Sequence, residues 1–484
     1  MLVQERLASD PGREGARPLV VDLDGTLIKT DILYESYFRA LPGDLRHHWA
    51  VVKALRGGKA QLKAMLAAAS AFEYATLPYD DAVLELAREA RQQGREVVLA
   101  TATDRQHAEG IAAHLGVFDR VIASDGTQNL ASNAKAQALV ALFGQQGFDY
   151  IGNGSDDLAV WAEAAEIYAI RTSSGVRRNI ARLGKPTHYI DAPKATLRVW
   201  MKAIRVHQYA KNFLVFVPAI TSHQFTLEAL ISACLAFMAF SACASGVYLL
   251  NDLLDLEADR IHPTKCHRPL ASGAIPISQA TAAIPLLFGL AALCAFAVSA
   301  GFAGVLTVYL VLTTAYSLHL KRKMLIDVVV LASLYTIRVI GGAVAVNVVV
   351  SEWLFAFSIF IFTSLALMKR YVELTAIADK GLMDPSNRNY KAKDAEIVAM
   401  LAAGAGMNAV TIFSLYVASP SVQTLYHRPS LLWLICPILL FWIARALMMA
   451  HRRHMHDDPV VFAIRDRVSR LAAVLVAAIL LAAV

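Results

Sequence analysis

The chain has 484 residues and a formal net charge of +7, and 56% of its residues are hydrophobic. The apolar excess lies after residue 195, whereas residues 1–195 have the composition of an ordinary soluble protein. The five cysteines are scattered, which excludes a disulfide framework or a zinc pattern. The modest positive charge indicates membrane topology and anionic ligands before nucleic acid, so we expect no nucleic-acid partner.

These shifts in composition predict a soluble domain fused to a polytopic membrane domain. Residues 1–17 are polar and charged, so we expect a disordered N-terminus without a signal peptide. The other expected parts are an α/β domain over 18–185, a linker or interfacial segment over 186–204, and an all-α membrane domain over 205–484.

The soluble part begins with a short apolar strand, 18–22, that runs into the sequence DLDGTL. Asp22 and Asp24 therefore stand at the C-terminal end of a strand, where ligands bind in open α/β sheets. Residues 31–90 are rich in helix formers and predict a small helical cap. Further polar side chains follow later strands and loops in the order Thr101, Lys135, Asn153 and Asp157.

Four motifs thus follow one another along the chain: DLDGTL, the strand that ends at Thr101, the loop with Lys135, and the segment with Asn153 and Asp157. In this order they resemble the motifs of the haloacid dehalogenase-like (HAD-like) phosphatases. The resemblance implies a Rossmannoid sheet, with Asp22 as the aspartyl nucleophile and Asp24 as the general acid/base. It further implies phosphoryl binding by Thr101 and Lys135, and a Mg²⁺ site formed by Asp22, Asp24, Asn153 and Asp157. The fourth motif often begins Gly-Asp but here begins Gly-Asn. The alternative is a degenerate domain kept for stability or docking.

Nine apolar segments follow, of which the first and last are rather short: 210–225, 228–250, 279–299, 302–319, 326–348, 352–368, 396–418, 430–450 and 470–484. Their charged connections are 251–278, 319–326, 369–395 and 451–469. The positive-inside rule places these connections, together with the soluble domain, on the cytoplasmic side of a bacterial plasma membrane.

The connection with the most distinctive chemistry is 251–273, NDLLDLEADRIHPTKCHRPLASG. If it starts as a helix, Asn251, Asp255 and Asp259 share one face, where like charges repel unless a cation binds. Their oxygens suit Mg²⁺, which commonly also takes substrate phosphates. Three bases follow, so the stretch predicts a cradle for a Mg-bound diphosphate: Arg260, Lys265 and Arg268. The alternative is a solvated charged loop.

Other charged residues have two interpretations each. Lys211, just before the first apolar segment, either binds phosphate or anchors the chain at the membrane. Arg338 lies about three turns into a span, so it faces a cavity or a partner, or is paired structurally with an acid. The histidines and acids of 451–470 match no metal site, and we expect a solvated loop that touches the soluble domain.

The motifs NDxxDxxxD and YSxxLKxxxxxD resemble the UbiA superfamily of intramembrane prenyltransferases over about 200–484. This resemblance implies a bundle of about nine helices, with two Asp-rich motifs, that most often joins a prenyl diphosphate to an aromatic acceptor. Here the second motif keeps one acid, Asp327. Together with HPTKxxRPLASG and DDPVVFAIRDR, this is closer to the decaprenyl-phosphate phosphoribosyltransferase branch. A transporter is disfavoured because transporters usually keep ionisable groups nearer the midplane.

That branch implies 5-phosphoribosyl 1-diphosphate (PRPP) as donor and polyprenyl phosphate as acceptor, with Mg²⁺ as cofactor. Aromatic prenyl transfer is the alternative. The implied catalytic residues are Asp252, Asp255 and Asp327, and the implied metal ligands are Asn251, Asp255 and Asp259. The implied substrate ligands are Lys211, Tyr248, Asn251, Arg260, Lys265, Arg268, Lys321, Arg338, Lys369, Arg370 and Tyr371. The HAD-like domain would then remove the 5-phosphate from the lipid-linked product, and the sequence is compatible with an oligomer.

Overall fold

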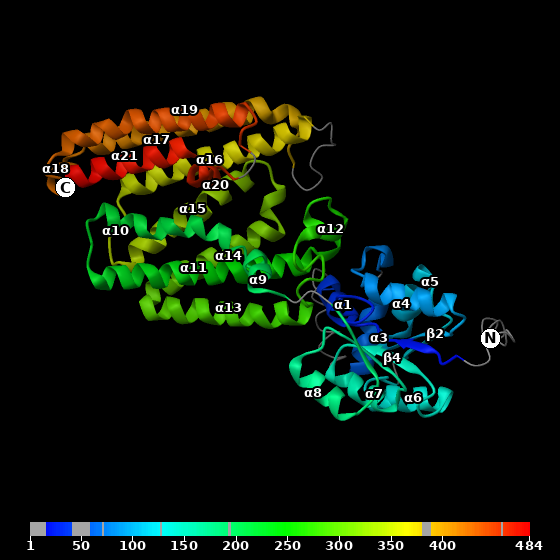
Figure 1. The fold of residues 1–484 in the computed structure, drawn as a ribbon. Helices are drawn as coiled ribbons and strands as arrows, with labels where there is room; N and C mark the ends of the chain where they lie inside the picture. The colour runs from blue at the N-terminus through cyan, green and yellow to red at the C-terminus, as the bar shows by residue number, and fades with distance from the viewer. Residues whose placement is uncertain are drawn as a thin grey trace. The chain divides into compact units, whose positions relative to one another are not determined.

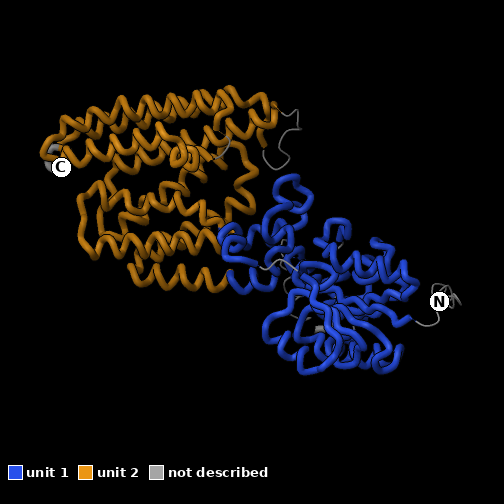
Figure 2. The backbone as a smooth tube through the Cα atoms, viewed as in Figure 1, with its two compact units in different colours: residues 1–204, 249–283 blue, residues 205–248, 284–484 orange. Residues whose placement is uncertain are grey.

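The computed structural model describes residues 16–40, 59–69, 72–125, 128–191, 195–379, 389–455 and 458–484. Of the N-terminal tail expected over 1–17, residues 1–15 lie outside the described residues. The chain divides into two compact units (Figure 2). Unit 1 comprises 1–204 and 249–283, and unit 2 comprises 205–248 and 284–484.

Unit 1 is built on a parallel six-stranded sheet with the order β3-β2-β1-β4-β5-β6 (Figure 1). Alternate residues of the central strand face opposite ways, so Val21 joins one buried core and Val20 the other. Both faces of the sheet are thus buried, as parallel sheets require. The strands are β1 Leu19–Val21, β2 Val97–Asp104, β3 Arg120–Ser124, β4 Asp149–Gly152, β5 Ile167–Ile170 and β6 Thr187–Ile190.

Helices cover both faces of this sheet. The first core contains residues of α4 Asp81–Gln92 and α5 Arg105–Leu115. The second contains residues of α6 Asn133–Phe143, α7 Leu158–Glu163 and α8 Ser174–Arg182. The expected helical cap is represented by α1 Ile32–Ala40 and α3 Lys59–Ala69, which pack together. Unit 1 also contains α9 Leu197–Ala203 and α12 Leu256–Ile261.

Unit 2 is helical throughout its described residues (Figure 1). Two of its helices continue into unit 1: α11 Leu227–Leu254 and α13 Ile277–Val298. The longer helices within it are α14 Ala300–Leu318, α15 Ile326–Ala345, α16 Glu352–Asp379, α17 Ala395–Ala418, α19 Ile435–His451 and α21 Arg467–Ala483. The shorter ones are α10 Val217–Thr221, α18 Pro420–Leu425 and α20 Pro459–Arg465, and a 3₁₀ segment, Val206–Phe216, precedes α10.

Seven of the described helical segments are long and apolar enough to cross a membrane: Leu227–Leu254, Ile277–Val298, Ala300–Leu318, Ile326–Ala345, Glu352–Asp379, Ala392–Ala418 and Pro429–His451. They match the inner seven of the nine expected segments. The first and last expected segments form the shorter helices α10 and α21. The expected fold class is confirmed: a parallel α/β domain precedes an all-helical integral membrane domain.

Candidate functional site

The carboxyl end of the sheet in unit 1 gathers the HAD-like residues. Asp22 follows β1, and its Oδ1 accepts a hydrogen bond from Lys135 Nζ at 2.6 Å. Asp157 Oδ1 accepts from the Tyr150 hydroxyl at 2.7 Å and lies 3.7 Å from Lys135 Nζ. These contacts bring together side chains from three separate segments because the ends of adjacent parallel strands meet at one edge.

Asp24 is held by two donors. Its Oδ1 accepts from the Ile32 amide at 2.9 Å, and its Oδ2 accepts from the Thr103 hydroxyl. Strand β2 runs past the expected end at Thr101, and the Thr101 hydroxyl is buried and accepts from the Thr103 amide at 3.0 Å. Thr103 was missed from the sequence, although its place two residues after Thr101 in the same strand was a usable signal.

The electrostatics of this pocket favour a cation. Burial, with help from Asp157 and Asp24, raises the pKa of Asp22 to about 7 against the opposing effect of Lys135. Burial and the Asp31 carboxylate raise the pKa of Asp24 to about 6. Burial lowers the pKa of Lys135, but the Asp22 and Asp157 carboxylates outweigh it and the net pKa is raised.

Three carboxylates therefore share one lysine, and their hard oxygens fit Mg²⁺. Within the described ranges, no three His, Cys, Asp or Glu side chains are already arranged as a metal cluster. A bound ion would accordingly take part of its shell from phosphate and water. The Asn153 side chain lies against Gly25 of the Asp22 loop, and the Asn153 amide donates to Asp157 Oδ2 at 2.9 Å.

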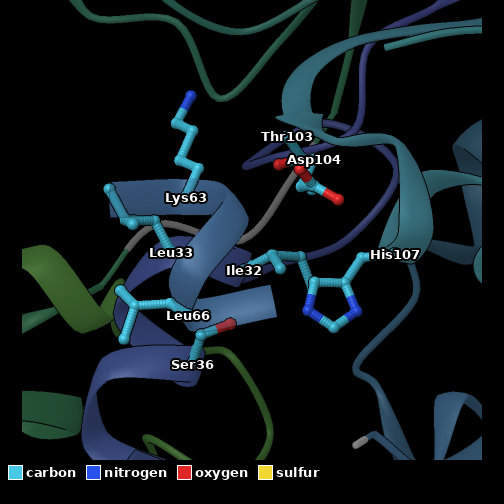
Figure 3. Close-up of a pocket in the computed structure, with 8 residues that line it drawn as sticks. All are labelled: Ile32, Leu33, Ser36, Lys63, Leu66, Thr103, Asp104 and His107. Carbon is cyan, nitrogen blue, oxygen red and sulfur yellow. The ribbon is translucent and has the colours of Figure 1, made fainter. Parts of the chain in front are cut away.

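A small cavity lies between α1, α3 and the end of β2 (Figure 3). Two of the residues that line it, Ile32 and Thr103, donate hydrogen bonds to Asp24. The cavity volume of about 10 Å³ suits a single water molecule. Lys63 of the cap lines it and donates to the Ala102 carbonyl at 2.6 Å and to Asn129 Oδ1 at 3.3 Å. Lys63 could not be predicted from the sequence, because a lysine in a helical cap is ordinarily a surface residue.

The acid-rich stretch 251–273 is charge-paired within unit 1. Helix α11 ends at Leu254 and α12 begins at Leu256, so the expected single helix is interrupted, although the amides of Asp255 and Asp259 still bond the carbonyls four residues earlier. Arg268 Nη1 lies 3.1 Å from Asp252 Oδ1 and 2.6 Å from Asp259 Oδ2.

Arg268 therefore neutralises the buried acids Asp252 and Asp259, so one acid of the expected cation-binding face is already paired with a base. Lys265 Nζ lies 3.8 Å from Asp259 Oδ1, while Asp255 is exposed and Asn251 half-buried. In this state two of the bases expected on phosphate, Arg268 and Lys265, contact Asp259, an acid expected on Mg²⁺, whereas the third, Arg260, binds an acid outside the stretch. A Mg-bound diphosphate would satisfy both sets at once, since its charges have the same two signs.

In unit 2 a second group of charges surrounds Tyr335 of α15. Asp458 accepts from Lys211 Nζ at 2.7 Å, from Lys369 Nζ at 3.2 Å and from the Tyr335 hydroxyl at 3.3 Å. Burial raises the pKa of Asp458, but the two lysines outweigh it and hold the pKa well below its usual range. The expected solvated loop is thus wrong for Asp458, whose side chain is only 8% exposed.

Arg338 adds a third cation to this group. Its guanidinium lies 5.8 Å from the centre of the Tyr335 ring and 4.9 Å from that of Tyr309. It donates to Asn212 Oδ1 at 2.8 Å and to the Tyr309 hydroxyl at 3.0 Å. The hydrogen-bond partners of this buried arginine are therefore neutral groups. The interpretation in which Arg338 is paired structurally with an acid required a carboxylate there.

Asp327 is fully enclosed in unit 2. Its Oδ2 forms an ion pair with Arg370 Nη2 at 2.7 Å, and its Oδ1 accepts from the Tyr390 hydroxyl at 2.7 Å. Arg370 also binds Glu373. A direct part for Asp327 in binding ribose or metal waters would need these contacts to open, so the observed geometry favours a role in positioning Arg370.

The remaining expected ligands make contacts of their own. The Tyr371 hydroxyl is 3.0 Å from His451 Nδ1. The Arg205 guanidinium lies over the ring of Tyr248, 4.6 Å from the centre of that ring. Lys321 lies on a short 3₁₀ turn, Leu320–Arg322, and is half-buried.

Comparison with known proteins covers both halves of the chain. Residues 213–468 match the model of the UbiA prenyltransferase family, and residues 19–161 match that of haloacid dehalogenase-like hydrolases. Uncharacterized protein y4nM of Sinorhizobium fredii is 35% identical over 463 residues, which is 95% of this chain and 90% of that protein.

Two further similarities cover smaller parts of the chain. The decaprenyl-phosphate phosphoribosyltransferase of Mycobacterium tuberculosis is 37% identical over 180 residues, covering 36% of this chain and 59% of that protein. A UbiA homologue from Archaeoglobus fulgidus bound to GPP and Mg²⁺ is 14% identical, with a TM-score of 0.46, covering 58% of this chain and 99% of that one. The chain belongs to the UbiA prenyltransferase family and carries an N-terminal HAD-like domain.

Proposed function

We propose that the chain transfers 5-phosphoribosyl from PRPP to a polyprenyl phosphate, and that its HAD-like domain then removes the 5-phosphate. The observation that carries this proposal is the group around Tyr335, where Lys211, Lys369 and Arg338 accompany one carboxylate, Asp458. Ionisable groups inside a membrane domain are costly and usually functional. An excess of cations, of which Lys211 and Arg338 are buried, fits a reaction that brings together several phosphates.

The similarity to a decaprenyl-phosphate phosphoribosyltransferase supports the same donor and acceptor. The second Asp-rich motif also supports this donor and acceptor, because it keeps only one acid, Asp327. The transfer breaks the bond from ribose C1 to the diphosphate oxygen, and the electron pair leaves with diphosphate. A lipid phosphate oxygen forms the new bond to C1, and the chain contributes mainly by positioning the reactants and stabilising the leaving group.

We assign the proposed roles by charge: acidic and amide side chains to Mg²⁺ and ribose, and basic side chains to phosphates. Asn251, Asp255 and Asp259 would hold Mg²⁺, which neutralises the departing diphosphate, and Asp252 would orient the ribose. Arg268 and Lys265 would exchange their acid partners for phosphate oxygens. Lys211, Lys369 and Arg338 would hold the remaining phosphates, and Asp327 would fix Arg370 in place.

In the HAD-like domain, Asp22 would attack the phosphorus while Asp24 protonates the departing ribose oxygen. Water would then hydrolyse the aspartyl phosphate, with Asp24 taking the proton. Lys135 and Thr101 would hold the phosphoryl oxygens. Both reactions require the cytoplasmic face of the plasma membrane, where the charged connections and soluble domain are expected.

The deciding experiment supplies radiolabelled PRPP, Mg²⁺ and polyprenyl phosphate to the purified chain in vesicles. We expect label in the lipid fraction, and none when polyprenyl phosphate is left out. Activity only with a prenyl diphosphate and an aromatic acid would overturn phosphoribosyl transfer in favour of aromatic prenylation.

Replacing Lys369 with Met should lower kcat/KM for PRPP by about a hundredfold, because a charge-assisted phosphate contact is lost. Initial rates over a range of PRPP concentrations measure the effect. The exposed Lys323 gives the matched control, and its change to Met should alter the rate by less than about twofold. Equal rates for the two variants would contradict a phosphate-binding role for Lys369.

A further inference from the structure

The connection between α11 and α13 packs as part of the HAD-like unit. Residues 249–283 belong to unit 1, although they include the end of one candidate span, Leu227–Leu254, and the start of the next, Ile277–Val298 (Figure 2). Gly273, with φ +72°, sits so close to Lys29 that a Cβ would lie 2.5 Å from the Lys29 Cβ. The acid-rich loop therefore ends on the segment that joins the Asp22 loop to α1.

The strongest tie between the loop and α1 is a buried ion pair. Arg260 Nη1 and Nη2 bind Glu35 Oε2 and Oε1 at 2.8 and 2.6 Å, and the two side chains are 6% and 4% exposed. Arg260 Nε also donates to the Ala271 carbonyl at 3.1 Å, and the Thr30 hydroxyl donates to Glu35. A bidentate pair fixes both distance and direction, which a surface contact does not.

Helix α1 carries this restraint to the phosphatase pocket. Glu35 lies one turn after Ile32, whose amide binds Asp24 Oδ1. At the other end, Arg260 follows Asp259, whose carboxylate binds Arg268. One short path thus joins the loop expected to hold diphosphate with the expected general acid/base of the HAD-like domain.

We propose that the Arg260–Glu35 pair is a positioning latch, through which the acid-rich loop of the transferase sets the placement of Asp24 in the phosphatase. This inference rests on the phosphatase activity proposed above. Glu35 does not touch the phosphoryl group, whose expected ligands come from β1, β2 and α6. Loss of the latch should therefore slow turnover and leave substrate binding nearly unchanged.

The test uses the full chain in vesicles and follows phosphate release from polyprenyl-phosphoryl-5-phosphoribose. Glu35→Gln should lower kcat by about tenfold with KM within about twofold, because misplacing a catalytic group by a fraction of an ångström is costly. Adding Arg260→Gln should lower kcat no further, because the two residues act as one contact that is already lost when either partner is replaced. The total lipid-linked phosphoribose made by Glu35→Gln should equal that of the unaltered chain.

The exposed pair on the same helix gives the matched control. Arg39 Nη2 lies 2.9 Å from Glu257 Oε2, with both side chains about one-third exposed, and Arg39→Ala should leave kcat unchanged. If Glu35→Gln keeps the original kcat while Asp22→Asn abolishes phosphate release, the latch is refuted and the phosphatase stands. If the unaltered chain and Asp22→Asn release phosphate equally, the phosphatase itself is refuted. Equal slowing by Arg39→Ala and Glu35→Gln would show a general loss of packing and also overturn the latch.

Discussion

Replacement of Asp22 by Asn should stop phosphate release, by at least about a thousandfold, while total transfer to lipid continues. An amide oxygen is too weak a nucleophile to accept the phosphoryl group, although Asn retains the shape of the side chain. The Asp22 carboxylate is 2.6 Å from Lys135 Nζ in a buried pocket. The substitution therefore also removes the negative charge that pairs with Lys135 where the phosphoryl group would react. The lipid product should accumulate with its 5-phosphate retained.

Chromatography of radiolabelled lipids separates the two products and gives their ratio over time. Asp156→Asn provides a matched control, because this residue is an exposed neighbour of Asp157 on the same turn. Its product ratio should match that of the unaltered chain. An unchanged product ratio in the Asp22 variant would mean that the HAD-like domain does not act after the transferase.

Replacement of Arg370 by Ala should lower the stability of the membrane domain by about 3–5 kcal/mol, since it leaves the Asp327 carboxylate buried without its cation. Arg370 and Asp327 are 1% and 0% exposed, so solvent cannot compensate for the lost partner. For a domain of this size, the change corresponds to a fall in Tm of about 5–15 °C. Thermal unfolding of the detergent-solubilised chain, followed by tryptophan fluorescence, measures it.

The exposed pair Arg453–Asp379, also in unit 2, is the control for this experiment. Arg453→Ala should leave Tm unchanged, because water solvates both groups and exposed pairs contribute little. The double variant Arg370→Leu, Asp327→Leu should recover much of the loss, since it removes both buried charges together. A Tm for Arg370→Ala equal to that of the control would contradict the buried pair.

Several features of the protein could be read from neighbouring residues alone. The apolar runs predicted the inner seven spans because hydropathy over about 20 residues decides whether a helix can cross a bilayer. The DLDGTL stretch, at the end of an apolar strand, predicted where Asp22 and Asp24 lie. The spacing of Asn251, Asp255 and Asp259 predicted one face of a helix. The structure keeps the backbone hydrogen bonds between these residues but divides the stretch between α11 and α12.

Only the tertiary structure decided which charge pairs with which. Asp458 binds Lys211, 247 residues away, and Arg260 binds Glu35, 225 residues away. No local pattern encodes such partners, because they depend on which segments pack together and on which side chains lose water there. The same packing enclosed Asp327, which the resemblance had implied as a catalytic residue. The sequence by itself thus determined the two domains and their chemical groups, while burial and long-range packing decided which of those groups are paired.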